Sequence, residues 1–315
     1  MLDSDVRDEL LLSVVVPVRG AAEAFPQLPS VSPDRDLDEA LEWVVVVDGV
    51  PSPALREWID RASNAAAVVV HEVHHRDPGL ARNEGLTLAQ GRYVCFLDAD
   101  DEALIASYIA LARKLSSDAA RIGVVGFRTV DETRHGKVVE TSYPVAGRHC
   151  GWVDLRRRAA VWRFVFEREF LVSSGVQFQR GGYGEDLLFL AEVLGDVPEV
   201  FGVSTLGYTY RVHSQSQLTA KRPKGREVSG LLDEIGLRVA TSRSMTAREV
   251  LSSWYSRIAL IHYPELRGRV ALDRKLIATG LLWSAADRLR GRAAQILEWV
   301  SSRRGVSASG GSETP

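Results

Sequence analysis

The sequence lacks the features of a disulfide-bonded, secreted or membrane-spanning protein. It has only 2 cysteines in 315 residues, which give neither a disulfide framework nor a zinc-ligand pattern, so a reducing compartment fits best. No apolar run reaches the roughly 18 residues that a membrane span needs. The first residues, MLDSDVRDE, are too acidic for a signal peptide. We therefore expect a cytoplasmic protein.

Net charge is low as well, but it is unevenly distributed. The chain carries -2 in total, yet 17 of its 39 Lys and Arg residues and only 9 of its 41 Asp and Glu residues lie from Lys221 onward. The part before Lys221 is therefore acidic, which argues against nucleic acid as its partner. The basic C-terminal part leaves room for an anionic surface or partner. With 45% hydrophobic residues, the chain can form one large domain, or one domain with a smaller appendage.

Apolar, β-branched segments alternate with helical ones over the first hundred residues. Strands are predicted at 11–18, 43–47, 66–73 and 93–97, and helices at 36–42, 53–62 and 79–90. Pro17 is expected to end the first strand. This alternation predicts βαβ units and a mostly parallel sheet in an α/β fold.

After residue 100 the pattern changes. We expect a helix at 101–116, a hairpin of 121–132 with 136–143, strands at 198–203 and 206–212, and helices at 226–240, 245–262 and 268–302. The last residues are rich in Ser and Gly and are predicted to be disordered. The expected organisation is a catalytic domain over 1–220, a helical C-terminal region over 221–304 and a disordered tail over 305–315.

An acidic cluster of Asp98, Asp100 and Asp101 follows the strand predicted at 93–97. The carboxyl edge of such a sheet is where ligands bind. Mg²⁺ or Mn²⁺ takes carboxylate oxygens together with substrate phosphates, and an Asp-x-Asp pair supplies such oxygens. The alternative is a solvated helix N-terminus, where Asp complements the helix dipole.

Four further groups of polar residues lie at the ends of predicted elements. Each has a functional interpretation as a base, phosphate, proton or metal contact, and a structural one as a turn, cap or surface residue. Strand alternation also places Arg211 and His213 on one face. The four groups are Asp48, Arg82 with Asn83, Glu185 with Asp186, and Arg211 with His213.

The order of these motifs resembles that of the GT-A glycosyltransferases of family 2, over roughly residues 11–217. The most specific part is the middle portion, residues 81–101. The acceptor-side stretch of these enzymes is similar to residues 161–171. The motifs are Pro17, Asp48-Gly49, Gly79-x-Ala-Arg-Asn-x-Gly-Leu-x-x-Ala-x-Gly-x-Tyr93, Phe96-Leu-Asp-Ala-Asp-Asp101, Gly184-Glu-Asp-x-x-Phe189 and Tyr210-Arg-x-His213.

The resemblance implies a GT-A, Rossmann-like fold and an inverting transfer from a nucleotide-diphosphate sugar, expected to be a UDP-sugar, to a hydroxyl acceptor. The acceptor would be a glycan, a lipid-linked molecule or another hydroxyl compound in cell-surface polysaccharide or glycoconjugate synthesis. On the donor side, the resemblance implies that Pro17 and Val18 line the nucleotide base, that Asp48 binds the base, and that Arg82 contacts the base or the diphosphate. Asp98 would reach the ribose and the metal shell, Asp100 would bind Mn²⁺ or Mg²⁺ directly, and Arg211 and His213 would contact the diphosphate, with His213 as a further candidate metal ligand. Asp186 would be the general base, supported by Glu185. Asp101 is expected to start the next helix.

Several positions depart from the family pattern on the base-binding side. Val47 replaces a usual Asp or Asn, Val50-Pro51 replaces Ser or Thr, Arg19 replaces an aromatic residue, and 21–41 lack the usual helix. These departures leave the donor open. Two other functions are alternatives for this sequence: a haloacid dehalogenase-type phosphatase with Asp98 as nucleophile, and a degenerate GT-A binding or assembly subunit. The phosphatase would need a motif on the first strand and a later Lys, and the chain has only five lysines.

The C-terminal helices have two interpretations. Their apolar residues are spaced like buried helix faces, which favours packing on the catalytic body or a homo-oligomer. The accompanying arginines also suit peripheral contact with an anionic membrane at the inner face of the cell membrane.

Overall fold

The computed structural model describes residues 10–22, 24–25, 27–28, 40–62, 67–156, 158–180, 183–195, 199–212 and 225–262. It divides into two compact units, Met1–Glu227 and Val228–Pro315. The predicted domain boundary at 220/221, the helix at 268–302 and the tail at 305–315 lie outside the described residues.

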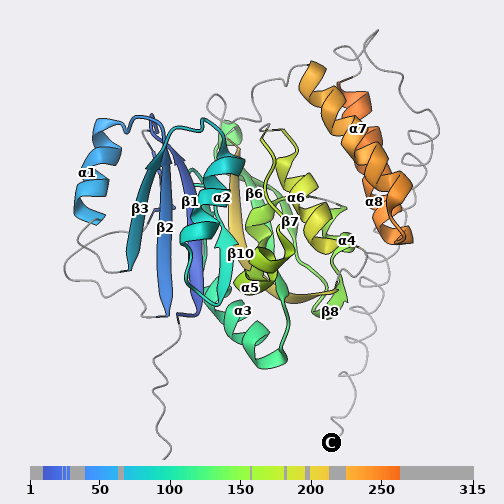
Figure 1. Ribbon diagram of the computed structural model, residues 1–315, viewed down its shortest axis with the longest axis horizontal. Helices are drawn as coiled ribbons and strands as arrows, with labels where there is room; N and C mark the ends of the chain where they lie inside the picture. The colour runs from blue at the N-terminus through green and yellow to red at the C-terminus, as the bar shows by residue number, and fades with distance from the viewer. Residues whose placement is uncertain are drawn as a thin grey trace, which may run out of the picture. The chain divides into compact units, whose positions relative to one another are not determined.

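Up to residue 118 the described elements are strands interleaved with three helices (Figure 1). In chain order the described elements are β1 (Leu12–Arg19), β2 (Leu41–Asp48), α1 (Pro53–Ala62), β3 (Val68–Val73), α2 (Pro78–Leu88), β4 (Tyr93–Phe96), β5 (Glu102–Ala103), α3 (Ile105–Asp118), β6 (Ile122–Asp131), η1 (Glu132–Arg134), β7 (Lys137–Ser142), β8 (Gly147–Cys150), α4 (Trp152–Leu155), η2 (Val161–Arg163), β9 (Phe164–Glu167), α5 (Arg168–Ser174), α6 (Glu185–Leu194), β10 (Glu199–Val212), α7 (Gly225–Thr241) and α8 (Met245–Ile261).

One sheet of ten strands organises the first unit. Its order is β3-β2-β1-β4-β9-β6-β10-β5, with β7 added to β6 and β8 added to β10. The strands β3, β2, β1 and β4 are parallel, as predicted, and β6 also runs parallel to β10. Strand β9 is antiparallel to both β4 and β6 and joins the two parallel parts. The α/β fold is thus confirmed, with a parallel N-terminal half and a mixed second half.

The first strand does not stop at Pro17, as the sequence suggested, but continues to Arg19. Leu12 N–H and Gly20 N–H donate to carbonyls on the β2 side, so the even-numbered N–H groups of β1 face β2. The nitrogen of Pro17 therefore faces β4. Pairing with β4 ends at Val15, so no ladder hydrogen bond is lost at Pro17.

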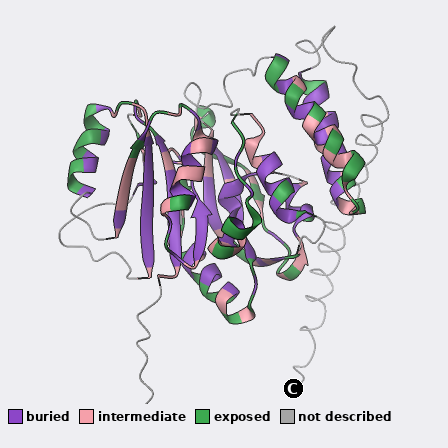
Figure 2. Cartoon of the chain, in the orientation of Figure 1, coloured by how far each residue is buried: buried purple, intermediate pink, exposed green. Residues whose placement is uncertain are grey.

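Helices cover both faces of the parallel half. Figure 2 shows β1, β2 and β4 almost wholly buried, the edge strand β3 partly exposed, and the helices exposed along their outer sides. Residues of α1 and α3 pack with the even-numbered side chains of β1 in one hydrophobic cluster. Helix α2 packs on the opposite face, where an added Cβ at Gly85 would lie 2.3 Å from Val15 Cγ1. This close approach brings α2 against the sheet at the strands' carboxyl ends.

Several predicted boundaries were wrong at element ends. Glu42 belongs to β2 rather than to a short helix over 36–42, and residues 36–39 lie outside the described part of the chain. Helix α3 begins at Ile105, after the short strand β5. The strands predicted at 198–203 and 206–212 form a single strand, β10, whose register against β6 shifts near Leu206.

The second unit is described through α8, with α7 spanning its boundary with the first. Both helices follow the predicted ranges to within one residue at each end; α7 buries one side, whereas α8 is buried around most of its circumference. Ser244 caps α8, since its hydroxyl accepts a hydrogen bond from Ala247 N–H. Across the described residues, no helix combines the length and hydrophobicity needed to cross a membrane.

Candidate active site

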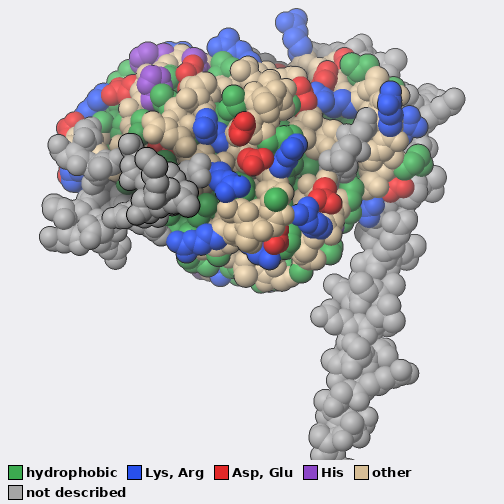
Figure 3. Space-filling model, turned by 60° about the horizontal axis from the view of Figure 1, so that its bottom comes forward, with side chains coloured by type: hydrophobic (Ala, Val, Ile, Leu, Met, Phe, Trp, Pro, Cys, Tyr) green, Lys and Arg blue, Asp and Glu red, His purple; other side chains and the backbone are tan. Residues whose placement is uncertain are grey.

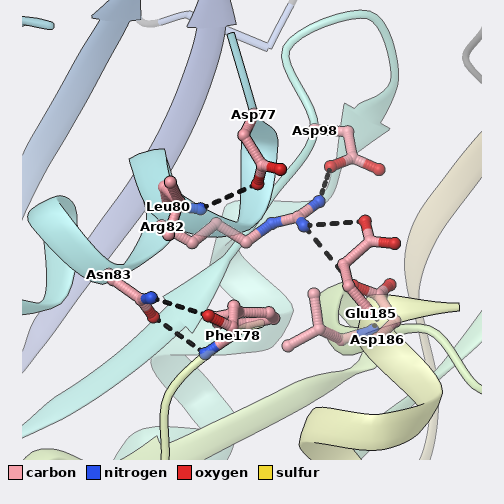
Figure 4. A network of polar contacts seen from close by, with 9 residues as sticks. Asp77, Leu80, Arg82, Asn83, Asp98, Phe178, Glu185 and Asp186 are labelled. Atoms are coloured by element: carbon pink, nitrogen blue, oxygen red, sulfur yellow. Dashed lines mark hydrogen bonds and ion pairs between the residues drawn. The ribbon is translucent and has the colours of Figure 1, made fainter. Parts of the chain in front are cut away.

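Arg82 gathers three carboxylates at the carboxyl end of the parallel strands (Figure 4). Its Nη2 lies 2.7 Å from Asp98 Oδ1, and its Nη1 lies 3.4 Å from Glu185 Oε1 and 3.4 Å from Asp186 Oδ1. The arginine comes from the second turn of α2, Asp98 follows β4, and the acidic pair opens α6. The sequence predicted all four as site residues, and the structure brings them together.

The guanidinium is almost fully enclosed, with 5% of its side chain exposed. Burial alone lowers the pKa of an arginine, but Asp186, Asp98 and Glu185 together raise the pKa of Arg82 above its ordinary value. One positive charge thus faces three carboxyl groups. Such a site carries more potential negative charge than positive charge, which suits a cation or an exchangeable proton.

Asp186 is held between a cation and a backbone donor. Its Oδ2 accepts a hydrogen bond from Val161 N–H at 3.0 Å, and its Oδ1 faces Arg82. Burial raises the pKa of Asp186 to about 7, with the charges of Glu185 and Asp98 acting in the same direction and Arg82 and the Val161 N–H opposing them. A carboxylate in this condition can accept a proton near neutral pH.

Asn83, beside Arg82 on α2, has a separate function. Its side-chain amide exchanges two hydrogen bonds of 2.9 Å with the backbone N–H and C=O of Phe178. The Phe178 ring stacks on Phe189 of α6 at 3.8 Å and lies under the Arg82 guanidinium at 5.3 Å. Asn83 therefore fixes the segment leading toward Glu185 against α2.

The three aspartates after β4 lie in different environments. Asp98 and Asp100 are half-buried, whereas Asp101 is 1% exposed. Asp101 does not start a helix, as had been expected. Its carboxyl group instead accepts hydrogen bonds from Tyr208 Oη at 2.8 Å and from Arg211 N–H at 2.7 Å, which ties the Asp98–Asp101 turn to β10.

A divalent cation fits the donor set at this turn only with help from substrate. Over the residues that the structure describes, no three His, Cys, Asp or Glu side chains are grouped as a metal site. Asp98 and Asp100 supply carboxylate oxygens, one of which is already paired with Arg82. Mg²⁺ and Mn²⁺ are commonly held by one or two carboxylates plus phosphate oxygens and water, and this pair meets that requirement.

On the base-binding side, Asp48 is occupied by backbone donors. Its two oxygens accept hydrogen bonds of 2.8 Å from Arg76 N–H and Asp77 N–H, and Asp77 in turn caps α2. Arg76 has a positive φ of 56°, which is uncommon for a residue with a side chain. Asp48 thus positions the start of α2, and each oxygen retains one acceptor site for a ligand.

The remaining predicted residues lie around this edge. Pro17 is half-buried, while Val18 is 2% exposed and packs in the core, so Val18 offers a ligand almost no open surface. Arg211 pairs with Glu102 at 2.7 Å and with Glu132. His213 lies outside the described residues.

Three contributions to the site were missed in the sequence. The Val161 N–H and the Tyr208 hydroxyl act through contacts with residues distant in the chain, and no local signal marks them. Asp77 could have been found, because an Asp followed by Pro at the start of a helical pattern is a helix N-terminus signature.

Sequence comparison identifies relatives of this chain. Residues 13–164 match the family described as Glycosyl transferase family 2. The uncharacterized glycosyltransferase YibD of Escherichia coli (strain K12) is 24% identical over 215 residues, covering 65% of this chain and 62% of YibD. The succinoglycan biosynthesis protein ExoO of Rhizobium meliloti (strain 1021) is 22% identical over 219 residues, covering 66% of this chain and 60% of ExoO. The matched region thus spans under two thirds of both relatives.

Solved structures share the fold. S. aureus TarS 1-349 in complex with UDP-GlcNAc has a TM-score of 0.61 at 15% identity, covering 86% of this chain and 79% of TarS 1-349. Its complex with UDP has a TM-score of 0.59 at 17% identity, covering 82% and 73%. The mannosyltransferase PcManGT of Pyrobaculum calidifontis, in complex with GDP-Man and Mn²⁺, has a TM-score of 0.50 at 15% identity, covering 93% and 79%.

Proposed function

Residues 13–164 place this chain in glycosyltransferase family 2, and from that premise we propose that it transfers a sugar from a nucleoside-diphosphate sugar to a hydroxyl acceptor with inversion. Asp186 is the general base of this reaction. The observation that carries the proposal is the setting of Asp186: a carboxyl group with a pKa raised to about 7, held by Val161 N–H and facing Arg82 beside the Asp-x-Asp turn.

The chemistry follows from one base and one leaving group. Asp186 takes the proton of the acceptor hydroxyl as the acceptor oxygen bonds to the anomeric carbon. The bond from that carbon to the diphosphate oxygen breaks, and its electron pair leaves with the nucleoside diphosphate. A single displacement inverts the anomeric centre and needs no covalent nucleophile. Glu185, which shares Arg82 with Asp186, supports the base or contacts the sugar.

Donor binding is assigned to the same edge of the sheet. Asp98 and Asp100 would hold Mn²⁺ or Mg²⁺, which neutralises negative charge on the leaving diphosphate. Arg82 and Arg211 contact the diphosphate, Asp98 the ribose, and Asp48 with Pro17 the base. His213 is a further candidate for the diphosphate or the metal. The complexes of TarS with UDP and UDP-GlcNAc and of PcManGT with GDP-Man and Mn²⁺ support a nucleotide-sugar donor, for which a UDP-sugar is proposed.

The acceptor is proposed to be a glycan, a lipid-linked molecule or another hydroxyl compound. The name of ExoO supports a role in polysaccharide synthesis. On the face shown in Figure 3, acidic and basic side chains are interspersed, which is unlike an extended nucleic-acid track. A cytoplasmic location, with the C-terminal helices contacting a membrane or a second copy, remains part of the proposal.

A degenerate binding subunit is the second candidate, and the intact Asp98, Asp100 and Asp186 disfavour it. The dehalogenase-type phosphatase is disfavoured because the Asp-x-Asp turn follows the fourth strand and Asp98 is paired with Arg82, which would weaken it as a nucleophile.

The test combines a donor panel with an Asp186→Asn variant. Purified protein with Mn²⁺ should cleave at least one of UDP- and GDP-sugars, and the rate should rise with pH through about 7 as Asp186 ionises. Asp186→Asn should lower kcat by about 10²–10⁴-fold and leave the UDP Kd nearly unchanged. Asp118→Asn, at the end of α3, is the control. Lost UDP affinity in Asp186→Asn would contradict the base function, and phosphatase turnover or absence of any nucleotide binding would favour the alternatives.

A further inference from the structure

A buried arginine lies two residues after the backbone donor that holds Asp186. Val161, whose N–H contacts Asp186, opens the short turn η2, and Arg163 closes it. The Arg163 side chain is 1% exposed and its guanidinium lies 5.0 Å from the centre of the Phe127 ring. Burying an arginine this completely is unfavourable unless its donors are satisfied in a defined geometry.

The guanidinium binds the chain segment that precedes η2. Its Nη1 donates to Asp154 O at 2.8 Å and to Arg158 O at 3.4 Å, and its Nη2 donates to Asp154 Oδ1 at 3.3 Å. One fork thus ties η2 to the end of α4 and to the carbonyl of Arg158. Because Val161 lies two residues before Arg163 in the same turn, we expect the direction of its N–H to depend on this fork.

The partner carboxylate is fixed from its other side. His149 Nε2 lies 2.7 Å from Asp154 Oδ2, and His149 Nδ1 lies 3.0 Å from the carbonyl oxygen of Gly147. Both ring nitrogens therefore face acceptors, which favours the doubly protonated ring. Burial lowers the pKa of His149, but the hydrogen bonds to Asp154 and Gly147 raise it on balance. Asp154 lies between the Arg163 guanidinium and the His149 ring, so its carboxylate is held from both sides.

We propose that Arg163 is a positioning residue for the Asp186 base, acting through the η2 turn to hold the Val161 N–H on Asp186 Oδ2. Arg163 would not touch substrate. The proposal rests on the proposed function only in naming Asp186 the base; the structural link from Arg163 to Asp186 can be measured without turnover. None of the motifs carried over from the family resemblance assigns this function to Arg163.

The groups that face Asp186 set its pKa, and a change in that pKa is how the effect of Arg163 can be measured. They are Arg82 from α2, Asp98 from the turn after β4, Glu185 from the start of α6 and the Val161 N–H from η2. A hydrogen bond donated to a carboxylate stabilises the ionised form. If the Val161 N–H moves away while the other three groups stay, the titration midpoint of Asp186 must rise.

The experiment is a carboxyl-carbon NMR titration of the full chain, labelled with ¹³C at the aspartate carboxyl carbons and free of metal. The Asp186 signal is identified by its loss in Asp186→Asn. In the wild type its midpoint should lie near 7. Val161→Pro removes the N–H, and the extended backbone of Ala160 suits a following proline at the first position of a turn. It should raise the midpoint by about one pH unit.

The Arg163 variants test the link itself. Arg163→Met should raise the Asp186 midpoint in the same direction, and so should Arg163→Lys, which keeps the charge but loses the planar fork. The double variant Val161→Pro/Arg163→Met should shift no further than Val161→Pro alone, because both changes act on one hydrogen bond. In active enzyme, the acid limb of the kcat profile should move with the midpoint while KM for the donor stays near the wild-type value.

Val161→Ala is the matched control, since it removes buried side-chain volume but keeps the N–H. It should leave the midpoint in place, and a shift equal to that of Val161→Pro would overturn the proposal. An unchanged midpoint in folded Arg163→Lys would also overturn it. If Arg163→Met does not fold, Arg163→Lys and Asp154→Asn test the proposal in the same way, because each change disturbs the contact between Arg163 and Asp154. A wild type that cleaves no nucleotide sugar would count against the proposed function alone, because the NMR titration does not need activity.

Discussion

Burial separates residues of one type that stand side by side in the chain. Asp98 and Asp100 are half-buried, while Asp101 is enclosed between the turn and β10, where Tyr208 and the Arg211 N–H donate hydrogen bonds to its oxygens. Burial and the nearby charge of Asp98 raise the pKa of Asp101 to about 8, against the lowering effect of those two hydrogen bonds. The third aspartate of the motif is therefore a neutral structural residue at pH 7.

The protonation of Asp101 predicts how stability depends on pH. A carboxyl group whose folded-state pKa lies above its unfolded value contributes stability that is full below the unfolded pKa and is lost as pH rises through the folded one. Asp101→Asn keeps an acceptor for the Arg211 N–H, but its amide N–H group would face the Tyr208 hydroxyl, which donates to Asp101 Oδ2 in the wild type. We therefore expect the variant to be less stable than the wild type by about 1 kcal/mol at low pH. Relative to this variant, the wild type should lose on the order of a few kcal/mol between about pH 4 and 8.

The measurement is urea unfolding of both proteins at a series of pH values in EDTA. The difference between the two free energies of unfolding isolates Asp101, because the other titrating groups are common to both. Parallel curves for wild type and Asp101→Asn would show that the carboxyl group is ionised in the folded protein, contrary to expectation.

The residue types and their places at strand ends could be predicted from the sequence, but their partners could not. Arg82 and Glu185 are separated by 103 positions and Tyr208 and Asp101 by 107. Such contacts depend on how the strands are ordered in the sheet, which local patterns do not specify. This is why Asp101 was assigned to a helix start, and why the contacts of Asp48 with the backbone N–H groups of Arg76 and Asp77 were not predicted.

At the scale of elements, strands and helices with a strong local pattern were predicted well. Helix α1 matches its predicted range, and β3, β4 and α2 differ by one or two residues at their ends. The errors occur where tertiary contacts override the local signal. Pro17 is tolerated within β1 because β4 ends beside it, and β10 continues through a register shift because β6 and β8 pair with it.

Helix α2 is the element on which the site depends, and its fit to the sheet can be tested at Gly85. Gly85→Ala would place a Cβ 2.3 Å from Val15 Cγ1 and 3.3 Å from Val46 Cγ2, so the helix must move outward. Overpacking of about 1–3 kcal/mol should outweigh the gain of up to about 1 kcal/mol in helix propensity. We expect lower stability in chemical denaturation and weaker UDP binding, because Arg82 moves with the helix.

Gly230→Ala is the matched control, at an exposed position of α7 where an added Cβ meets nothing within 4 Å. It should stabilise its unit by about 0.5–1 kcal/mol. If Gly85→Ala also proved stabilising, the close packing of α2 on β1 would not exist in solution.

At the scale of the whole molecule, the chain has two compact units, and the candidate site lies within the first. The parallel half of the sheet could be predicted because each βαβ segment carries its own periodicity. The antiparallel insertion of β9 between β4 and β6 could not be predicted, since a strand of four residues has no reliable local signal.

The candidate site takes its residues from α2, the turn after β4 and the start of α6. Ligand binding to the site should therefore stabilise the first unit as a whole and not merely one loop.

This coupling gives the last prediction, which concerns metal and nucleotide together. A ligand that binds only the folded state stabilises it by about 2.7 kcal/mol at a concentration 100-fold above its Kd. UDP or GDP with Mn²⁺ should thus raise the thermal midpoint of the unit Met1–Glu227 more than nucleotide with EDTA does, because Asp98 and Asp100 would hold the cation together with the diphosphate. Asp100→Ala should remove the Mn²⁺-dependent part of the shift and retain the part that Arg82 provides.

Glu57→Ala is the control for this variant: it removes a 73% exposed carboxylate on α1 and should behave as wild type. A full Mn²⁺-dependent shift in Asp100→Ala would mean that the cation is held without this residue, and the Asp-x-Asp turn would then lose its assignment as the metal-binding part of the site.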